Sequence, residues 1–380
     1  MARRASADLP LHSGSAPRWL FDRMVELSGA IAAVIVDEYG PEELLRRLAD
    51  PYWFQALGCA LGFDWHSSGV TTTTMGALKE ALADRDLGVV VVGGKGATSR
   101  QTPDEIDATG LDLAGGTREA LKRTSRLSAA VDNGCVQDSY TLYHHTMAVA
   151  ESGDWCVVQQ GMNEATARRY HWLADGVESF VEEPQAAIAA QERQPDPLDL
   201  TAEASAETRA VSVDLVQDDP VHLKRELRGQ RSLADFGAGG AAGSPRLREA
   251  LSGLDADPAL SMPTHHELRD ADLSERALDQ LQRAYQYQPT DYEELVELDG
   301  IGPGSLRALA LLAELVYDAE TSREDPAKYA YAHGGKDGTP HPVKRERYDR
   351  SIDHLKSVLE GAEVDRETKQ QSLKRLAKLG

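Results

Sequence analysis

The segment Leu298–Leu309 (LDGIGPGSLRAL) carries the most specific chemical pattern in the chain, two helices joined by a glycine turn. An amphipathic helix is expected over Tyr292–Leu298. In the following turn, Gly300 and Gly302 tolerate positive φ and leave no Cβ to obstruct a ligand. Pro303 suits the first position of the second helix. The turn offers backbone N–H groups at a positive helix N-terminus, which predicts a phosphate site. The phosphate-binding positions expected there are Gly300, Ile301, Gly302, Gly304, Ser305 and Arg307.

This segment resembles the helix-hairpin-helix motifs of DNA-repair enzymes, including the endonuclease III-like glycosylases. The resemblance covers about residues 290–318 and implies binding to the DNA backbone without sequence preference. Glycosylases of that group that also cleave the strand carry a lysine just after the hairpin, where this chain has Gly304. Strand cleavage would therefore need residues from elsewhere. The alternative is an ordinary helical corner that packs and binds nothing.

The chain as a whole resembles an archaeal and bacterial family known only as domain of unknown function 763. Besides the hairpin, the matching stretches are DLPLHSG, FDWHSSGVTTTT, VVGGKGATSRQTP, YTLYHHT, VVQQGMN, ARRYHWL and AHGGKDGTPHPV. This resemblance implies no particular activity, so the function has to be argued from the residues.

A glycine-rich loop, Gly93–Arg100, directly follows the buried strand expected at Val89–Val92. Its glycines let the backbone approach an anion, and Lys95 and Arg100 supply positive charge. The glycine spacing differs from that of a nucleotide-binding phosphate loop. A strand-ending turn with a solvated lysine explains the same residues equally well.

Two further segments contain groups suited to acid–base or amine chemistry. Asp64 and His66, in the stretch Phe63–Thr74, could act as general base or hold a hard metal ion. Lys336, in a second Gly-Gly-Lys loop, competes with Lys95 as an amine nucleophile that could form a Schiff base with an abasic sugar. The alternatives are a locally satisfied turn in the first segment and simple phosphate contact in the second.

Arginines and histidines elsewhere give weaker patterns. Arg168 and Arg169 lie in the stretch ARRYHWL, expected on a helix that Asn163 caps and that runs to about Ala174. Cations among aromatic residues suit contact with phosphate and unpaired bases, although buried aromatics with solvated arginines are the simpler interpretation. The adjacent histidines 144 and 145 lie on an expected strand and face opposite ways, so no metal site is predicted.

The composition is that of a soluble globular protein, with 41% hydrophobic and 27% charged residues. The net charge of −21, from 62 acidic and 41 basic residues, argues against nucleic acid in a simple count. Acid excess with few lysines is also typical of halophilic, archaeal-like proteins, in which salt screens long-range charge. Three cysteines without a pairing pattern and no apolar leader or membrane span indicate a cytoplasmic protein.

Hydrophobic periodicity predicts an α+β N-terminal domain, with helices and a small sheet containing a hairpin, and an all-α C-terminal helix-hairpin-helix domain. The expected helical stripe from Trp19 to Ile35 ends at Gly40, and strands are expected over 140–150 and 155–160. The domain boundaries follow from composition. We expect a mixed, candidate catalytic domain at 1–180, an acidic connector with a helix and a Gly-rich linker at 181–253, and the helical domain at 254–380.

Together these features favour a DNA-repair or DNA-processing enzyme: a glycosylase, an abasic-site lyase or a structure-specific nuclease. The catalytic candidates are Asp64, His66, Lys95 and Lys336, and the additional phosphate-binding candidates are Arg100, Arg168 and Arg169. The partner expected is DNA, and the only cofactor considered is Mg²⁺ or Mn²⁺ for a nuclease. Two alternatives remain open, a non-catalytic DNA-binding or recruitment protein and an enzyme acting on a small phosphorylated or nucleotide substrate.

Overall fold

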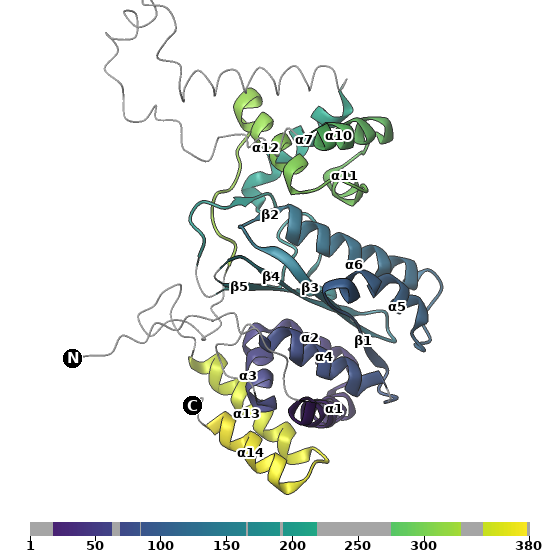
Figure 1. The fold of residues 1–380 in the computed structure, drawn as a ribbon, viewed down its shortest axis with the longest axis vertical. Coiled ribbons are helices and arrows are strands. Elements are labelled where there is room, and N and C mark those ends of the chain that lie inside the picture. Colours follow the sequence, from purple (N-terminus) through teal and green to yellow (C-terminus); the bar gives the residue numbers. More distant parts are fainter. Residues whose placement is uncertain are drawn as a thin grey trace, which may run out of the picture. The chain divides into compact units, whose positions relative to one another are not determined.

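The computed structural model describes residues 18–62, 69–83, 85–164, 166–190, 193–218, 275–327 and 345–377. The chain divides into two compact units, each drawn in Figure 1. Unit 1 comprises residues up to Asn133, Gln137–Pro197 and Asp325–Gly380. Unit 2 comprises Gly134–Val136 and Leu198–Glu324. The protein is thus a mixture of helices and a small antiparallel sheet, as the sequence indicated in outline.

Unit 1 is built around a five-stranded antiparallel sheet with the order β1-β3-β4-β5-β6. The strands are β1 (Val89–Lys95), β3 (Thr141–Ala150), β4 (Trp155–Met162), β5 (Ala167–Leu173) and β6 (Ala187–Ala190). β3 and β4 form the predicted hairpin, in which the N–H of Ala150 donates to the carbonyl of Asp154 across the turn. The valine run of β1 pairs with the end of β3, so the predicted buried strand is confirmed.

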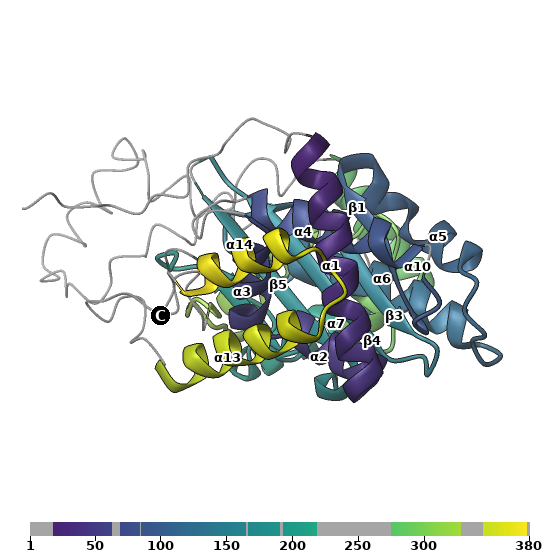
Figure 2. The same ribbon diagram turned by 90° about the horizontal axis from the view of Figure 1, so that it is seen from below.

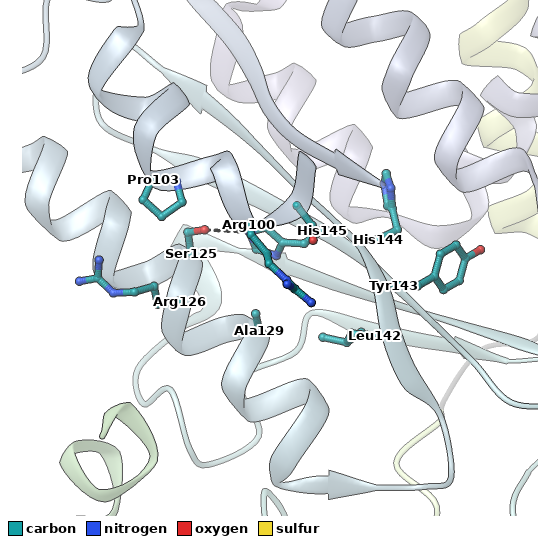
Figure 3. Close-up of a pocket in the computed structure, with 10 residues that line it drawn as sticks. Arg100, Pro103, Ser125, Arg126, Ala129, Leu142, Tyr143, His144 and His145 are labelled. Atoms are coloured by element: carbon teal, nitrogen blue, oxygen red, sulfur yellow. Dashed lines mark hydrogen bonds between the residues drawn. The ribbon is translucent and has the colours of Figure 1, made fainter. Parts of the chain in front are cut away.

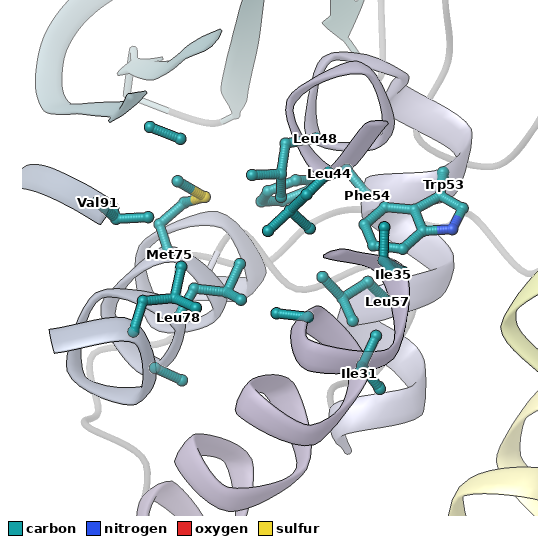
Figure 4. Close-up of a cluster of buried hydrophobic side chains, with 14 of the residues drawn as sticks. Ile31, Ile35, Leu44, Leu48, Trp53, Phe54, Leu57, Met75, Leu78 and Val91 are labelled. Carbon is teal, nitrogen blue, oxygen red and sulfur yellow. The ribbon is translucent and has the colours of Figure 1, made fainter. Parts of the chain in front are cut away.

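Helices cover one face of this sheet and enclose the main hydrophobic core. They are α1 (Arg18–Tyr39), α2 (Pro41–Ala49), α3 (Pro51–Leu61), α4 (Gly69–Ala83), α13 (Arg345–Gly361) and α14 (Arg366–Ala377). Figure 4 shows how side chains from the first four helices meet those of β1 around Phe54, Met75 and Val91. Figure 2 shows α13 and α14 lying against α1 and α3, and Leu355 and Leu359 of α13 complete the core.

The boundaries of these helices follow from local sequence. Gly40 adopts φ +87 and ends α1, as predicted from the periodic stripe. Pro51 opens α3, and the Asp50 carboxylate caps it by accepting the N–H groups of Tyr52 at 2.8 Å and Trp53 at 3.2 Å. Gly62 closes the same helix in the left-handed region.

The opposite face of the sheet is covered by α6 (Thr117–Gly134), which follows β1 through the 3₁₀ helix η1 (Gly96–Gln101) and α5 (Thr102–Ala108). The face of α6 turned to the sheet carries apolar residues, among them Leu127 and Val131, and also polar ones. Those buried polar residues are Thr124, Ser125, Ser128 and Asp132. Such groups require hydrogen-bond partners inside the protein, and the sheet supplies them.

Unit 2 contains α7 (Ala206–Gln217), α10 (Glu275–Tyr287), α11 (Tyr292–Glu297) and α12 (Pro303–Tyr317). Short elements precede them: β2 (Val136–Gln137) pairs with β7 (Leu198–Asp199), and η3 (Glu203–Ser205) leads into α7. Helix α12 packs on α7 and α10 through residues such as Leu306 and Leu309, which are almost completely buried.

Two expectations from the sequence are wrong. The segment after Asn163 forms strand β5 and not a helix, because the Asn163 side chain stabilises the β4–β5 turn by accepting the N–H of Thr166 at 2.8 Å. Both faces of β5 are buried, so its polar residues alternate between two interiors and give no helical stripe. Within the predicted acidic connector, Ala187–Ala190 form strand β6 of the sheet, which pairs with β5. The short 3₁₀ helix η2 (Ala174–Gly176) lies between these two strands in the chain.

The grouping into units also differs from the predicted division at the C-terminus. Residues 254–380 were expected to form one helical domain. Helices α13 and α14 contact α3 and belong to unit 1, whereas α10, α11 and α12 belong to unit 2. The predicted Gly-rich linker lies outside the described residues.

Gly93 has a steric role that a substitution can test. Its φ is +87, and a Cβ there would lie 2.4 Å from the backbone oxygen of His145. Gly93→Ala should lower the free energy of unfolding by about 2 kcal/mol or more, because left-handed backbone and a backbone clash add together. Gly96→Ala is the control, since Gly96 has φ +62 but no atom within 4 Å of the added Cβ. Equal losses in chemical denaturation would contradict the close approach.

Candidate functional site

A cavity of about 220 Å³ opens in unit 1 where β1 runs into η1 and both meet α6 and β3. Figure 3 shows side chains from three segments, η1–α5, α6 and β3, converging on it. Its lining residues are Ser99, Arg100, Pro103, Ser125, Arg126, Ala129, Leu142, Tyr143, His144 and His145. None of them is acidic, although the whole chain carries a net charge of −21.

Two backbone irregularities shape the mouth of this cavity. A β-bulge at Tyr143 shifts the register of β3 on β4, so the strand bends where it lines the cavity. The glycine loop after β1 is fixed by Glu105, whose carboxylate accepts the N–H of Gly93 at 2.7 Å and pairs with Lys79 at 2.6 Å. The N–H of Gly93 is therefore engaged by the protein itself, and Lys95 and Arg100 are the exposed cationic side chains of the loop that could meet an anion.

A continuous chain of hydrogen bonds runs from the cavity into the sheet. The Oγ of Ser125 lies 2.8 Å from Nε2 of His145, and Nδ1 of His145 lies 2.9 Å from Oε1 of Gln159. Nε2 of Gln159 donates to Asp132 at 2.6 Å. Because an amide oxygen only accepts, His145 donates from Nδ1, and its Nε2 accepts the hydroxyl proton of Ser125.

Burial sets the protonation of this chain. It lowers the pKa of His145 to about 4, and the hydrogen bond to Gln159 opposes that shift. Burial also raises the pKa of Asp132 to about 7, against hydrogen bonds from Gln185 and Trp172 that favour its charged form. At neutral pH the imidazole of His145 is therefore uncharged, and its unprotonated Nε2 faces the hydroxyl of Ser125.

The other face of the sheet holds a second polar network beneath α3 and α4. His144 is buried there, its pKa is lowered to about 3 by burial, and its Nδ1 has no hydrogen-bond partner. Gln160 bonds to both Thr71 and Tyr143. His145 bonds to Ser125 of α6, whereas Gln160, which pairs with His144 across the strands, bonds to Thr71 of α4; the prediction that histidines 144 and 145 face opposite ways is therefore confirmed.

The arginines of β5 lie inside the protein and not on a nucleic-acid surface. Arg168 is 0% exposed and is held between Asp138 at 2.7 Å and Asp325 at 2.6 Å. Arg169 is equally buried, stacks over Phe54 at 4.4 Å and donates to His171 at 2.8 Å. The simpler interpretation is right that the aromatic residues of this stretch are buried, but its expectation of solvated arginines is wrong, because both arginines are buried against structural partners.

The glycine turn in unit 2 joins α11 to α12. Gly300 adopts φ +95, and the N–H of Ile301 donates to the carbonyl of Leu298 at 3.0 Å. Pro303 occupies the first turn of α12, and Gly302 precedes it without a side-chain cap. Among the described residues, a Cβ on Gly302 would meet no atom within 4 Å apart from its chain neighbours, so there is space beside this residue.

The remaining predicted positions divide into those that the structure describes and those it does not. Lys95 is exposed, with Nζ 5.7 Å from the centroid of the Tyr143 ring, and Arg100 is exposed at the cavity. Asp64, His66 and Lys336 lie outside the described residues. Three further predicted positions lie in α12, where Gly304 and Arg307 are partly exposed and Ser305 is buried.

Sequence reasoning missed Ser125 and Asp132, two members of the hydrogen-bonded chain. Both lie on α6, seven residues apart, and neither stands in a recognisable motif. The signal available in the sequence was a row of hydroxyl and carboxyl residues on the apolar face of an amphipathic helix. Such a row indicates buried polar contacts but does not identify the histidine that they meet.

The described residues contain no group of three or more His, Cys, Asp or Glu side chains arranged to hold a metal ion. In the same part of the chain, every helix is too short or too polar to span a bilayer.

Residues 5–343 match the family described as "Protein of unknown function (DUF763)". No curated protein and no solved structure matches the chain.

The buried histidine gives a pH dependence of stability with a definite sign. His145 has a pKa of about 4 in the folded protein and about 6.5 in an unfolded chain. Between these values the unfolded state binds more protons, so this contribution to stability is present above about pH 6.5 and is lost as the pH falls towards 4. Its slope should approach about 1.4 kcal/mol per pH unit. In denaturant unfolding between pH 4 and 6.5, the free energy of unfolding should depend less steeply on pH for His145→Gln than for the wild type. Parallel profiles would mean that His145 is charged or solvated when folded.

Proposed function

The chain belongs to the DUF763 family, and we propose that it is a DNA-binding, DNA-processing protein that holds the phosphate backbone with the turn between α11 and α12. The observation that carries this proposal is the open, uncapped start of α12 behind Gly302. Backbone N–H groups at such a position point at a ligand, and the helix dipole favours negative charge there.

The hydrogen bonds at the start of α12 support this function. The N–H of Leu306 donates to the carbonyl of Gly302 at 3.1 Å, in the position of the first intrahelical bond. The N–H groups of Gly304 and Ser305 come before that bond and have no acceptor within the helix. The Ser305 hydroxyl donates to Gln280 at 3.1 Å, which fixes α10 beside this end of α12.

Acidic side chains around the turn limit the affinity for DNA. Asp299 is exposed at the turn itself, and the first turn of α11 carries Glu293 and Glu294. These charges repel phosphate at long range, so attraction must come from short hydrogen bonds to backbone N–H groups. Contacts of that kind carry no base information, which predicts modest affinity without sequence preference.

An enzyme that acts on a phosphorylated substrate in the cavity of unit 1 is the second candidate function. The specific observation in its favour is that Arg100, Ser125 and His145 line one cavity that has no acidic residue in its wall. This candidate is independent of the turn in unit 2.

A single substitution can separate DNA binding by the turn from general effects on folding. Gly302→Leu places a side chain where phosphate is expected, and its Cβ would meet no described atom within 4 Å apart from its chain neighbours. Affinity for duplexes of unrelated sequence should fall about tenfold or more, because charge-assisted hydrogen bonds are lost. Fluorescence anisotropy with labelled duplexes at two salt concentrations measures this loss.

Gly110→Leu is the matched control, since its added side chain also enters open space and its backbone φ is unstrained. Circular dichroism checks that both variants are folded. DNA affinity that is unchanged in a folded Gly302→Leu variant would remove the turn from the binding surface.

A further inference from the structure

We propose that the cavity of unit 1 is the active site of a phosphate-ester hydrolase, in which Ser125 is the nucleophile, His145 its base and Arg100 the anion-binding group. The proposal rests on the second candidate function and does not depend on DNA binding by the turn in unit 2. The substrate class is a small ester of phosphoric acid.

The orientation of Ser125 separates it from an ordinary helix serine. Buried serines commonly bond back to a carbonyl one turn earlier, as Ser128 does with the carbonyl of Ser125 at 3.3 Å. Ser125 instead directs Oγ to Nε2 of His145 at 2.8 Å, from a position that lines the cavity. Figure 3 shows this bond as a dashed line between α6 and β3. A hydroxyl bonded to a neutral imidazole is the arrangement that nucleophilic catalysis requires.

His145 is held in the tautomer that this chemistry needs. Its Nδ1 donates to the Gln159 carbonyl at 2.9 Å, so Nε2 keeps its lone pair for the Ser125 proton. Gln159 is itself anchored by Asp132 at 2.6 Å, which prevents its amide from turning over. Burial keeps the imidazole neutral at pH 7, because its pKa is lowered to about 4. A nearby phosphate anion would favour the protonated form as it develops.

The charge of the cavity selects an anionic substrate. Arg100 and Arg126 line it, both are exposed, and no carboxylate of the lining set neutralises them. In Figure 3 the side chain of Arg100 extends over β3 beside His145, whereas Arg126 projects away from the histidines. Arg100 is therefore the better placed of the two to hold phosphate oxygens by paired hydrogen bonds. Leu142 and Pro103 provide apolar wall for the remainder of the ester.

The reaction has two steps. In the first, Oγ of Ser125 forms a bond to phosphorus while the bond from phosphorus to the leaving alcohol oxygen breaks. The hydroxyl proton passes to Nε2 of His145 and then to the leaving oxygen. In the second step, water attacks the phosphoserine, gives a proton to His145, and releases phosphate as Ser125 recovers its proton. Arg100 neutralises the charge on the phosphoryl oxygens in both steps.

A fluorophosphonate probe tests the nucleophile on the full-length protein. Attack by Ser125 forms the phosphorus–oxygen bond, expels fluoride and passes the proton through His145 to solvent. Peptide mass mapping should find the label on Ser125 of the wild type. Ser125→Ala should abolish labelling, and Ser128→Ala, the neighbouring buried serine on the same helix, should preserve it. An unlabelled wild type, or a label that persists in Ser125→Ala, would overturn the proposal.

Arg100→Gln tests the substrate class and changes only an exposed side chain. Inorganic phosphate should slow labelling of the wild type, and this protection should weaken about tenfold or more in the variant. Hydrolysis of p-nitrophenyl phosphate and of bis-p-nitrophenyl phosphate distinguishes a monoesterase from a diesterase, and activity on either supports the proposal. Hydrolysis of p-nitrophenyl acetate alone, or protection unchanged in Arg100→Gln, would contradict a phosphate site.

The two proposals fail separately. Gly302→Leu should lose DNA binding and keep fluorophosphonate labelling, whereas Ser125→Ala should do the reverse. Loss of both properties in one folded variant would show that a single site serves them and would overturn the assignment of the hydrolase to the cavity alone.

Discussion

The carboxylate of Asp132 is the interaction on which the arrangement of unit 1 depends. It accepts hydrogen bonds from Gln159 on β4 at 2.6 Å, from Trp172 on β5 at 2.9 Å and from Gln185 before β6 at 2.8 Å. The Trp172 indole is fully buried, so loss of this acceptor would leave its N–H unsatisfied at a cost of about 1–3 kcal/mol. Asp132 therefore fixes how α6 sits on the sheet. Ser125 lies two helical turns earlier on the same face, so the carboxylate also sets the position of the hydroxyl against β3.

The sheet itself is unusual in carrying rows of polar side chains on both buried faces. Residues paired across three strands continue each row: His144, Gln160 and Arg169 on one face, and His145, Gln159 and Tyr170 on the other. Adjacent residues of one strand thus serve different interiors. The row beneath α6 contains His145, which lines the cavity together with the exposed Arg100 and is bonded there to Ser125.

The sequence predicted elements whose signals are local. The stripe ending at Gly40, the proline that opens α3, the valine strand and the β3–β4 hairpin all depend on residues close together in the chain. Strand β5 was missed because its alternation of buried polar residues lacks the apolar–polar contrast on which strand prediction relies. The cavity could be predicted only in part. Arg100 stands in a glycine loop that attracts attention, but the contact of Ser125 with His145 arises from packing between distant segments.

Helices α13 and α14 follow unit 2 in the chain but pack on α3 of unit 1, which has a consequence for how the protein is made. A ribosome delivers residues in order, so nearly all of unit 2 emerges before the last apolar residues of the first core, among them Leu355, Val358 and Leu359. Until α13 and α14 have been made, the apolar surface of α3 that they contact stays exposed in the nascent chain. The core of unit 1 therefore cannot be completed until α13 has been synthesised.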